Sequence, residues 1–282
     1  MNALGIANPF GAPVYHEETV TSTMDAARRL ADGDAPHGTV ITADFQEAGR
    51  GRGRGRPWNM DRGRNLPFTL LLRYDGFAAV PPALTLRTGL AAALAIEAFA
   101  PSLAGLLRIK WPNDLMAPVA GQYRKIAGIL TEGDGKRVFI GIGVNVAQTA
   151  FPDDLRTKAG SIALALGAGG QAADTQAAVA LAAESLAAAR FTLLEKILAG
   201  IYRELEARPG PANSAQESWR ARLDERLFMK GQQVSFIPGG PDSGQSVEGT
   251  LLGIGLAGEI LLLPDGEKNP RSFITGELRV YA

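Results

Sequence analysis

An abrupt change of patterning near Met229 constrains the fold of this chain more than any other feature. Before it, residues 171–207 are rich in Ala, Leu and Glu, a composition that favours helices. From Lys230 onward, short apolar runs alternate with Gly, Pro and Asp, a pattern typical of a small all-β barrel. The runs are residues 234–237, 249–254, 259–263, 271–274 and 278–281. We therefore expect two domains, residues 1–229 and residues 230–282.

The first of these domains mixes helix and strand patterns, which predicts an α+β fold. The chain has 282 residues and is 46% hydrophobic, enough for one large and one small domain, each with its own core. Strands are expected over residues 66–73, 106–110, 126–131 and 137–146, and a strand–helix–strand unit over 14–43. Helices are expected over residues 82–100, 171–207 with a break near 190–192, and 215–228.

Composition excludes several classes of function. Lys+Arg and Asp+Glu both number 29, so no global charge favours nucleic acid or an anionic membrane. The chain has no cysteine, which excludes a thiol nucleophile and cysteine-ligated metals. His16 and His37 lie too far apart in sequence for a metal-ligand spacing, so we expect no metal-ligating residues. Without a signal peptide or a run of about eighteen apolar residues, a soluble cytoplasmic protein is expected.

Residues 49–56 alternate Gly and Arg, followed by Pro57 and Trp58, with Arg62 and Arg64 just beyond. Glycine lets successive backbone N–H groups converge on an anion, and each guanidinium grips phosphate or carboxylate bidentately. The arginines repel one another, and Asp61 is the one acid nearby, so this loop should be poorly ordered without an anion. By itself the segment also fits a solvated basic loop or an RG-rich nucleic-acid contact.

Three further motifs follow. Lys110-Trp-Pro-Asn-Asp114 ends a strand-like run, Lys125 enters the apolar run Ile126–Leu130, and Gly141-Ile-Gly-Val-Asn145 places two glycines in a strand. Glycines in a strand let a ligand approach the backbone closely. Taken singly, the first motif fits an ordinary turn and the glycine pair fits packing against a helix.

Taken together and in this order, the motifs resemble those of the bacterial biotin–protein ligases. The resemblance rests on Thr21-Ser-Thr23, Gln46-x-Ala-Gly-Arg-Gly-Arg52 and the three later motifs. The run from Gly253 to Leu262 resembles the C-terminal module of the same family, so the likeness covers nearly the whole chain from Val14. The Lys-Trp-Pro-Asn-Asp and arginine-loop pair is highly specific, whereas the small-residue motifs are weak alone.

The resemblance implies a mixed β-sheet catalytic domain flanked by helices, related to class II aminoacyl-tRNA synthetases, followed by an SH3-like β-barrel. It implies a ligase that uses biotin, ATP and Mg²⁺ to form biotinyl-5′-AMP and pyrophosphate. The biotin would then pass to one lysine of the biotin carboxyl carrier protein of acetyl-CoA carboxylase or a related carboxylase.

The site residues follow by position. The resemblance assigns biotin contacts to Ser22, Thr23, Gln46, Arg50, Gly51, Arg52, Lys125, Gly128 and Gly143. It assigns nucleotide contacts to Arg56, Trp58, Asn113, Lys125 and Asn145, and catalytic roles to Arg52, Lys110, Asp114 and Lys125. Lys125 matches the lysine that holds the reacting carboxylate and the α-phosphate. Asp114 is the candidate for orienting the acceptor amine.

The sequence departs from the family pattern in four places. An extra Gly-Arg unit leaves either Arg52 or Arg54 as the central loop arginine, and Met24 stands where many relatives have asparagine. Ala120 and Gly121 enlarge a linker, and the Ala-rich segment 171–189 is an addition. Because the motifs begin within about twenty residues of Met1, we expect no helix-turn-helix domain and no operator DNA as partner. The resemblance is compatible with a homodimer formed edge to edge.

Three alternatives remain. A lipoate–protein ligase uses the same two-step logic, although the terminal barrel and Lys110–Asp114 favour biotin. An RNA-binding module built on the arginine loop would predict a basic domain, which the zero net charge disfavours. A degenerate ligase that binds biotin without turnover is disfavoured by the intact Lys110, Lys125 and arginines.

Overall fold

The computed structural model describes residues 1–53, 57–167, 172–206, 214–239 and 246–279, and these form two sheets with helices packed around the larger one. The large sheet has eight strands in the order β1-β2-β3-β4-β8-β7-β6-β5. Its strands are β1 Asn2–Ala3, β2 Val14–Val20, β3 Val40–Gln46, β4 Leu66–Arg73, β5 Arg108–Lys110, β6 Asp114–Val119, β7 Gln122–Gly133 and β8 Arg137–Val144. Strands β2 and β3 are parallel and the other neighbours antiparallel, which confirms the expected mixed sheet.

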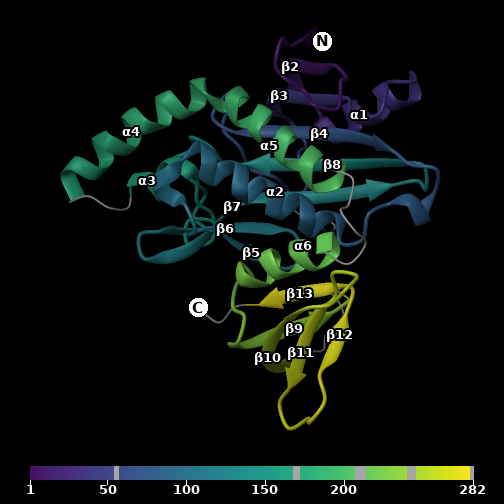
Figure 1. The fold of residues 1–282 in the computed structure, drawn as a ribbon. Coiled ribbons are helices and arrows are strands. Elements are labelled where there is room, and N and C mark those ends of the chain that lie inside the picture. The colour runs from purple at the N-terminus through teal and green to yellow at the C-terminus, as the bar shows by residue number, and fades with distance from the viewer. Residues whose placement is uncertain (54–56, 168–171, 207–213, 240–245, 280–282) are drawn as a thin grey trace.

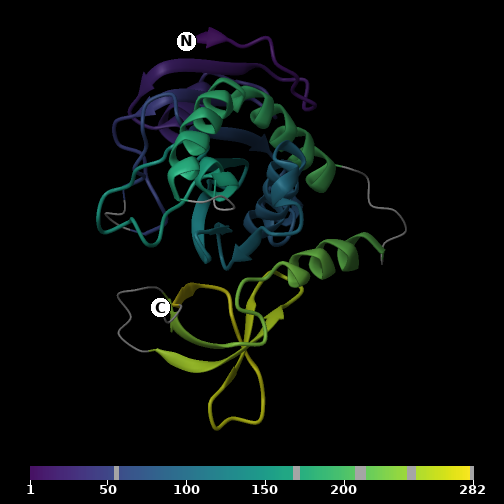
Figure 2. The ribbon, with the colours of Figure 1, turned by 90° about the vertical axis from the view of Figure 1, so that its left-hand side faces the viewer.

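Helices cover the two faces of this sheet unequally. Helix α2 (Leu84–Phe99) and helix α5 (Arg190–Leu205) lie across one face, as Figures 1 and 2 show, and helix α1 (Thr23–Asp32) packs on the other. Strand β4 explains the division, because successive side chains of a strand point to opposite faces. Leu70 and Leu72 belong to the main core with α2 and α5, whereas Leu71 joins the smaller core beneath α1.

Helix α2 is the most apolar helix of the fold's interior. The stretch Phe77–Phe99 has the length and composition of a membrane span, but 56% of its most apolar window is buried inside the protein. Leu90 and Ile96 are fully buried in the same core as Leu194 and Ile197 of α5. We therefore interpret α2 as the central core helix of the α+β layer.

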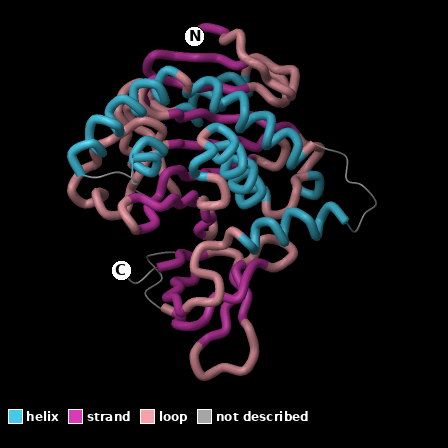
Figure 3. The backbone as a smooth tube through the Cα atoms, turned by 60° about the vertical axis from the view of Figure 1, so that its left-hand side comes forward, coloured by secondary structure: helices cyan, strands magenta, loops and turns pink. Residues whose placement is uncertain are grey.

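The second sheet is smaller and entirely antiparallel, with strand order β12-β11-β10-β9-β13. Its strands are β9 Gln233–Pro238, β10 Val247–Ile254, β11 Ile260–Pro264, β12 Arg271–Phe273 and β13 Gly276–Arg279. It lies beyond the β5 edge of the large sheet, as the tube in Figure 3 shows. Five short antiparallel strands at this position agree with the expected SH3-like barrel.

The connection between the two sheets is itself hydrogen bonded. Helix α6 (Ser214–Glu225) is followed by residues that extend the large sheet: Ile109 donates to the Arg226 carbonyl at 2.8 Å, and Phe228 donates to the Ile109 carbonyl at 2.9 Å. The Trp111 indole then donates to the Gly258 carbonyl of the second sheet at 3.0 Å and packs on Phe236. The tryptophan of the Lys-Trp-Pro-Asn-Asp motif therefore attaches the barrel to the large sheet.

Strands β1 and β6, helix α3 (Ile162–Gly167) and two short 3₁₀ helices were not among the expected elements. Strand β6 was missed, because Asp114–Val119 follows a turn-like motif, and it forms a hairpin with β7 through Ala120 and Gly121. Helix α3 was also missed, since it is too short for a helical period. The Ala-rich segment forms helix α4 (Ala172–Ala188), and the break before α5 falls at Ala189.

Candidate active site

A pocket lies on the α1 face of the large sheet, lined by Arg50–Arg52 of the arginine–glycine loop, by Trp58 and by residues of β7 and β8. Strand pairing explains the hollow: Gly143 stands opposite Gly128 on β7, and Gly141 stands beside Thr69 of β4, so small residues share one face. The pocket gathers the predicted residues Ser22, Thr23, Gln46, Arg50, Gly51, Arg52, Trp58, Asn113, Lys125, Gly128 and Gly143. Residues far apart in the sequence therefore converge on one site.

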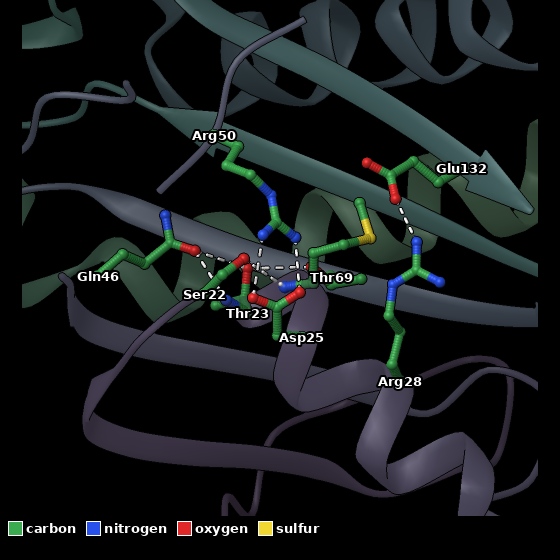
Figure 4. A network of polar contacts seen from close by, with 9 residues as sticks. Ser22, Thr23, Asp25, Arg28, Gln46, Arg50, Thr69 and Glu132 are labelled. Atoms are coloured by element: carbon green, nitrogen blue, oxygen red, sulfur yellow. Dashed lines mark hydrogen bonds and ion pairs between the residues drawn. The ribbon is translucent and has the colours of Figure 1, made fainter. Parts of the chain in front are cut away.

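One end of the pocket is a chain of short polar side chains (Figure 4). Ser22 caps helix α1 by accepting a hydrogen bond from the Met24 backbone N–H at 3.2 Å. The Thr23 backbone N–H and Oγ1 both donate to Gln46 Oε1, at 2.8 and 3.0 Å. Thr69 Oγ1 donates to Thr23 Oγ1 at 3.0 Å. These hydroxyls are buried and mutually fixed, so their orientation exists before any ligand binds.

Arg50 closes the rim above this polar end. Its guanidinium donates two hydrogen bonds to Asp25, Nη2 to Oδ1 at 2.6 Å and Nη1 to Oδ2 at 3.1 Å (Figure 4). These hydrogen bonds raise the pKa of Arg50, against a lowering by partial burial, and the charges of Asp25 and Glu132 add to the rise. One turn further along α1, Arg28 forms an ion pair with Glu132 of β7.

The next arginine of the loop reaches the second sheet. Arg52 lines the pocket, and its Nη2 donates to the Gly276 carbonyl at the start of β13, at 2.5 Å. The loop therefore contacts both sheets. Arg54 and Arg56 lie outside the described residues, so the predicted nucleotide contact of Arg56 and the choice between Arg52 and Arg54 stay predictions.

The cationic end of the pocket is built around Lys125. Its Nζ pairs with Asp114 Oδ1 at 2.6 Å, and the two side chains are 33% and 21% exposed. The Lys125 backbone is held by residues 158–160. Its carbonyl accepts from the Gly160 N–H and its N–H donates to the Lys158 carbonyl, both at 2.8 Å. The ion pair with Asp114 holds the Lys125 amine at the pocket.

Trp58 covers the glycine floor. A Cβ atom built on Gly143 would lie 2.6 Å from Trp58 Cε2 and Cζ2, and one on Gly128 would lie 3.3 Å from Trp58 Cζ3. Lys125 Nζ sits 5.6 Å from the indole centroid, within cation–π range. The buried Trp58 Nε1 has no hydrogen-bond partner within the part of the chain that the structure describes. The indole therefore lies over Gly128 and Gly143, the residues that the resemblance assigns to the biotin site.

Three of the predicted residues do not line this pocket. Lys110 ends β5 and Asp114 begins β6, and Asp114 acts on the site through its ion pair with Lys125. Asn145 is buried and donates through Nδ2 to the Gly160 carbonyl at 2.8 Å, which supports the segment that holds Lys125. Asn113, by contrast, lines the pocket and donates to the Ile129 carbonyl at 2.9 Å.

The sequence interpretation assigned no ligand contact to six lining residues, Met24, Thr69, Ile129, Leu130, Gly141 and Ile142, although Gly141 belongs to the glycine pair that it singled out. Thr69 is the lone hydroxyl in the apolar strand Leu66–Arg73, and that isolation was the available signal. The prediction that Asp61 is the one acid near the loop arginines was wrong, because acids that are distant in sequence lie beside them. Arg50 pairs with Asp25 and Arg64 pairs with Glu184. The expected order of the loop with and without an anion stays a prediction.

Comparison with known proteins agrees with this geometry. The model of the biotin/lipoate A/B protein ligase family matches residues 17–146, which places that segment in this class of ligases. The biotin–acetyl-CoA-carboxylase ligase of Mycobacterium tuberculosis is 30% identical over 230 residues, covering 80% of this chain and 74% of that protein. The chain therefore belongs to the biotin protein ligase family.

Two further comparisons define how far the likeness extends. The bifunctional ligase/repressor BirA of Bacillus subtilis is 40% identical over 162 residues, 55% of this chain and 47% of that protein. The chain thus spans about half the length of the BirA proteins it matches. The biotin protein ligase of Aquifex aeolicus in complex with biotin and ATP shares the fold, with a TM-score of 0.66, 23% identity, and 94% and 97% coverage.

Proposed function

We propose that this protein is a biotin–protein ligase that activates biotin with ATP and transfers it to a lysine of a biotin carboxyl carrier protein. The observation that carries the proposal is one pocket with two chemically different ends, a fixed hydroxyl and amide cluster and a lysine–arginine group. Biotin has the same asymmetry, because its ureido ring both donates and accepts hydrogen bonds while its other end is a carboxylate.

The ring end of biotin would bind at Ser22, Thr23 and Gln46. Their oxygens and the Gln46 amide offer donors and acceptors without rearrangement, since the cluster is already hydrogen bonded internally. Gly128 and Gly143 would form the floor, and Trp58 would move aside or turn to admit the ligand. Gly51 and Arg52 would cover the bound acid.

The chemistry would take place at Lys125. Attack of the biotin carboxylate on the α-phosphate of ATP brings two anions together, and cations placed at that point lower the barrier. Lys125 and the loop arginines would hold both groups. Asn113 would lie beside them in the pocket, and Asn145 would lie behind them. The bond formed is the acyl–phosphate anhydride of biotinyl-5′-AMP, and the bond broken releases pyrophosphate.

The second half-reaction needs a neutral amine and a dry mixed anhydride. The acceptor lysine must lose a proton before its amine attacks the acyl carbon, and biotinyl-5′-AMP must be kept from water until then. We propose that Asp114 orients the incoming amine, since it lies within 2.6 Å of Lys125, and that Lys110 of the same motif flanks the approach. The arginine–glycine loop would exclude water.

Mg²⁺ is expected with ATP, but the described residues contain no group of three or more His, Asp or Glu side chains that could hold a metal ion. Within the described ranges the protein therefore provides no cage of side chains for the ion. Mg²⁺ commonly binds through substrate phosphates and keeps several waters, so the ion would enter with the nucleotide.

We also propose the division into a catalytic domain, residues 1–229, and a barrel domain, residues 230–282. The two sheets lie on either side of this boundary, and Trp111 and Arg52 connect them. The biotin protein ligase family acts on biotin carboxyl carrier proteins, and we propose such a protein as the partner.

The test is transfer to a purified apo carrier domain, followed by intact mass measurement. The protein is incubated with ATP, Mg²⁺ and either biotin or lipoate, with a carrier whose acceptor lysine is replaced by arginine as the matched control. A biotinyl mass shift on the native carrier alone supports the proposal. A lipoyl shift would assign the lipoate branch of the class, and no shift with either acid would reject ligation.

A further inference from the structure

Met24 is an apolar residue at the polar end of the pocket, and the chemistry described above gives it no role. It lines the pocket beside Thr23 and Thr69 and is 4% exposed. It is also one of the positions at which this sequence departs from the family pattern. A thioether is at most a weak hydrogen-bond acceptor, so whatever Met24 contributes to a ligand is an apolar contact.

The backbone of Met24 is fixed, whereas its side chain is adaptable. Its N–H donates to Ser22 Oγ at 3.2 Å in the N-cap of α1. Its side chain belongs to the small core beneath α1, together with Leu71 and Phe139. Methionine is unbranched and has three rotatable side-chain bonds, so it can fill an irregular space next to a fixed backbone.

The space that Met24 fills lies over Gly141 of β8. A Cβ atom built on Gly141 would lie 2.9 Å from Met24 Cε, so the S-methyl group packs against the position that a side chain would take. In the same row of the sheet, Gly141 pairs with Thr69 of β4 on one side and with Leu130 of β7 on the other. Across this row the pocket changes from a hydroxyl, through the S-methyl group, to an isobutyl group.

The ring end of the pocket therefore has a polar side and an apolar side. Thr23, Gln46 and Thr69 form the polar side through their mutual hydrogen bonds, and Met24 and Leu130 form the apolar side. The fused rings of biotin are divided in the same way, because one edge is a ureido group and the other consists of carbon and sulfur. Reversing the rings would leave buried donors and acceptors unpaired, which is costly.

We propose that Met24 is a specificity-determining residue, whose S-methyl group over Gly141 forms the wall that contacts the thioether ring of biotin. The proposal deepens the proposed function and rests on it for the identity of the acid. It follows that Met24 distinguishes acids by the apolar edge of the ring, while the hydroxyl cluster distinguishes them by the polar edge.

Equilibrium binding of two analogues to the full protein separates the two edges. Desthiobiotin keeps the ureido ring and lacks the sulfur, whereas 2-iminobiotin keeps the thioether ring and carries an imine in place of the ureido oxygen. In Met24→Ala we expect the ratio of the Kd for desthiobiotin to the Kd for biotin to fall on the order of tenfold, because the wall no longer contacts the thioether ring. The corresponding ratio for 2-iminobiotin should stay within about twofold of wild type.

Two variants separate the wall from a general loosening of the core. Leu71→Ala removes a fully buried side chain from the same small core without touching the pocket lining, and it should leave both ratios within about twofold of wild type. Met24→Leu nearly conserves the volume of the side chain and should retain most of the discrimination against desthiobiotin. Thermal unfolding of each variant checks that the protein is folded during the titration.

A further variant approaches the same contact from the floor of the pocket. In Gly141→Ala the added methyl group would lie 2.9 Å from Met24 Cε, so the thioether must move, and we expect the Kd for biotin to rise on the order of tenfold. Combining this change with Met24→Ala removes the obstacle. The double variant should therefore bind biotin no more weakly than Gly141→Ala alone.

The outcomes separate this proposal from the proposed function. If the desthiobiotin ratio in Met24→Ala equals that of wild type or of Leu71→Ala, or if the losses from Gly141→Ala and Met24→Ala add, Met24 is not the wall of the ring site. If the wild-type protein binds biotin but transfers none to the carrier, the proposed ligase fails, and the binding ratios still decide the role of Met24. Binding of neither biotin nor desthiobiotin to the wild-type protein would overturn both.

Discussion

The two ends of the pocket differ in how their polar groups are satisfied. At the hydroxyl end, Thr23, Gln46 and Thr69 satisfy one another through short buried hydrogen bonds. At the cationic end, Lys125 is satisfied by an acid of the protein itself, Asp114. The hydroxyl end is finished before a ligand arrives, whereas the cationic end holds its charge on a carboxylate that an incoming anion can replace.

The contrast between the two ends predicts which end determines the affinity for biotin and which end determines the rate of the chemical step. A buried, internally bonded cluster selects a ligand by matching fixed donors and acceptors, and it depends little on ionic conditions. A partly exposed pair of opposite charges is worth little in stability, so its partner can be exchanged. Substitutions at the two ends should therefore produce different kinetic effects, and the predictions below test that contrast in order of decreasing size.

The largest effect is expected for Lys125→Ala. Removing the cation that faces both the carboxylate and the α-phosphate should lower kcat for adenylate formation by about 10²–10³-fold. Biotin binding should change far less, since the hydroxyl end is intact. Single-turnover formation of biotinyl-5′-AMP measures the first quantity and equilibrium biotin binding the second, with Lys196→Ala as a control lysine outside the pocket. A loss confined to binding would reverse the roles assigned to the two ends.

The next effect concerns the floor between the two ends. Gly143→Ala places a methyl group 2.6 Å from Trp58, so the indole must shift or the floor must rise. Overpacking of this kind costs about 1–3 kcal/mol, and if that cost falls on the bound state, the KM for biotin should rise by about fivefold to 150-fold.

Two variants check the cause of that effect. Gly5→Ala, where an added methyl group has open space, should leave the KM unchanged. Combining Gly143→Ala with Trp58→Ala removes the clash and should recover part of the lost thermal stability. If the double variant is less stable than Gly143→Ala alone, Trp58 is not the group that opposes the methyl.

A smaller effect is expected for Thr69→Val at the hydroxyl end. The substitution removes the hydrogen bond to Thr23 Oγ1 in a buried position and should lower the free energy of unfolding by about 1 kcal/mol. Biotin affinity should fall about fivefold, with kcat unchanged. Chemical denaturation and calorimetric titration give the two values, and a drop in kcat with normal affinity would place Thr69 in the wrong half of the pocket.

The smallest effect comes from salt. Raising the ionic strength from about 0.1 to 1 M shortens the Debye length from about 10 to 3 Å, which weakens partly exposed charge contacts. The KM for ATP should rise about twofold to threefold while the Kd for biotin stays nearly constant. If salt changed the KM for ATP and the Kd for biotin equally, the cationic end would not be more sensitive to ionic strength than the hydroxyl end.

The sequence was informative about local chemistry and less so about pairing. The cap at Ser22, the arginine–glycine loop and the glycines of β8 follow from residue type and spacing, and all three meet in one pocket. Thr69 was missed because its position depends on the register of β4 against β8, which no local pattern specifies.

Long-range contacts were the other limit. The Arg50–Asp25 pair and the attachment of Trp111 to Gly258 join residues that lie 25 and 147 positions apart. Their partners become neighbours when the sheet and the barrel assemble, so spacing gives no hint of them. Trp111 illustrates the consequence: a residue of the most specific motif connects the two sheets instead of lining the pocket.

The central claim is that this pocket joins biotin to the α-phosphate of ATP, and biotin-dependent exchange of labelled pyrophosphate into ATP tests it most directly. The wild-type protein is assayed with Mg²⁺ and biotin, with lipoate, and with no acid. Our account predicts exchange that requires biotin and is absent with lipoate or without an acid. Exchange that is independent of biotin, or no exchange with either acid, would contradict it.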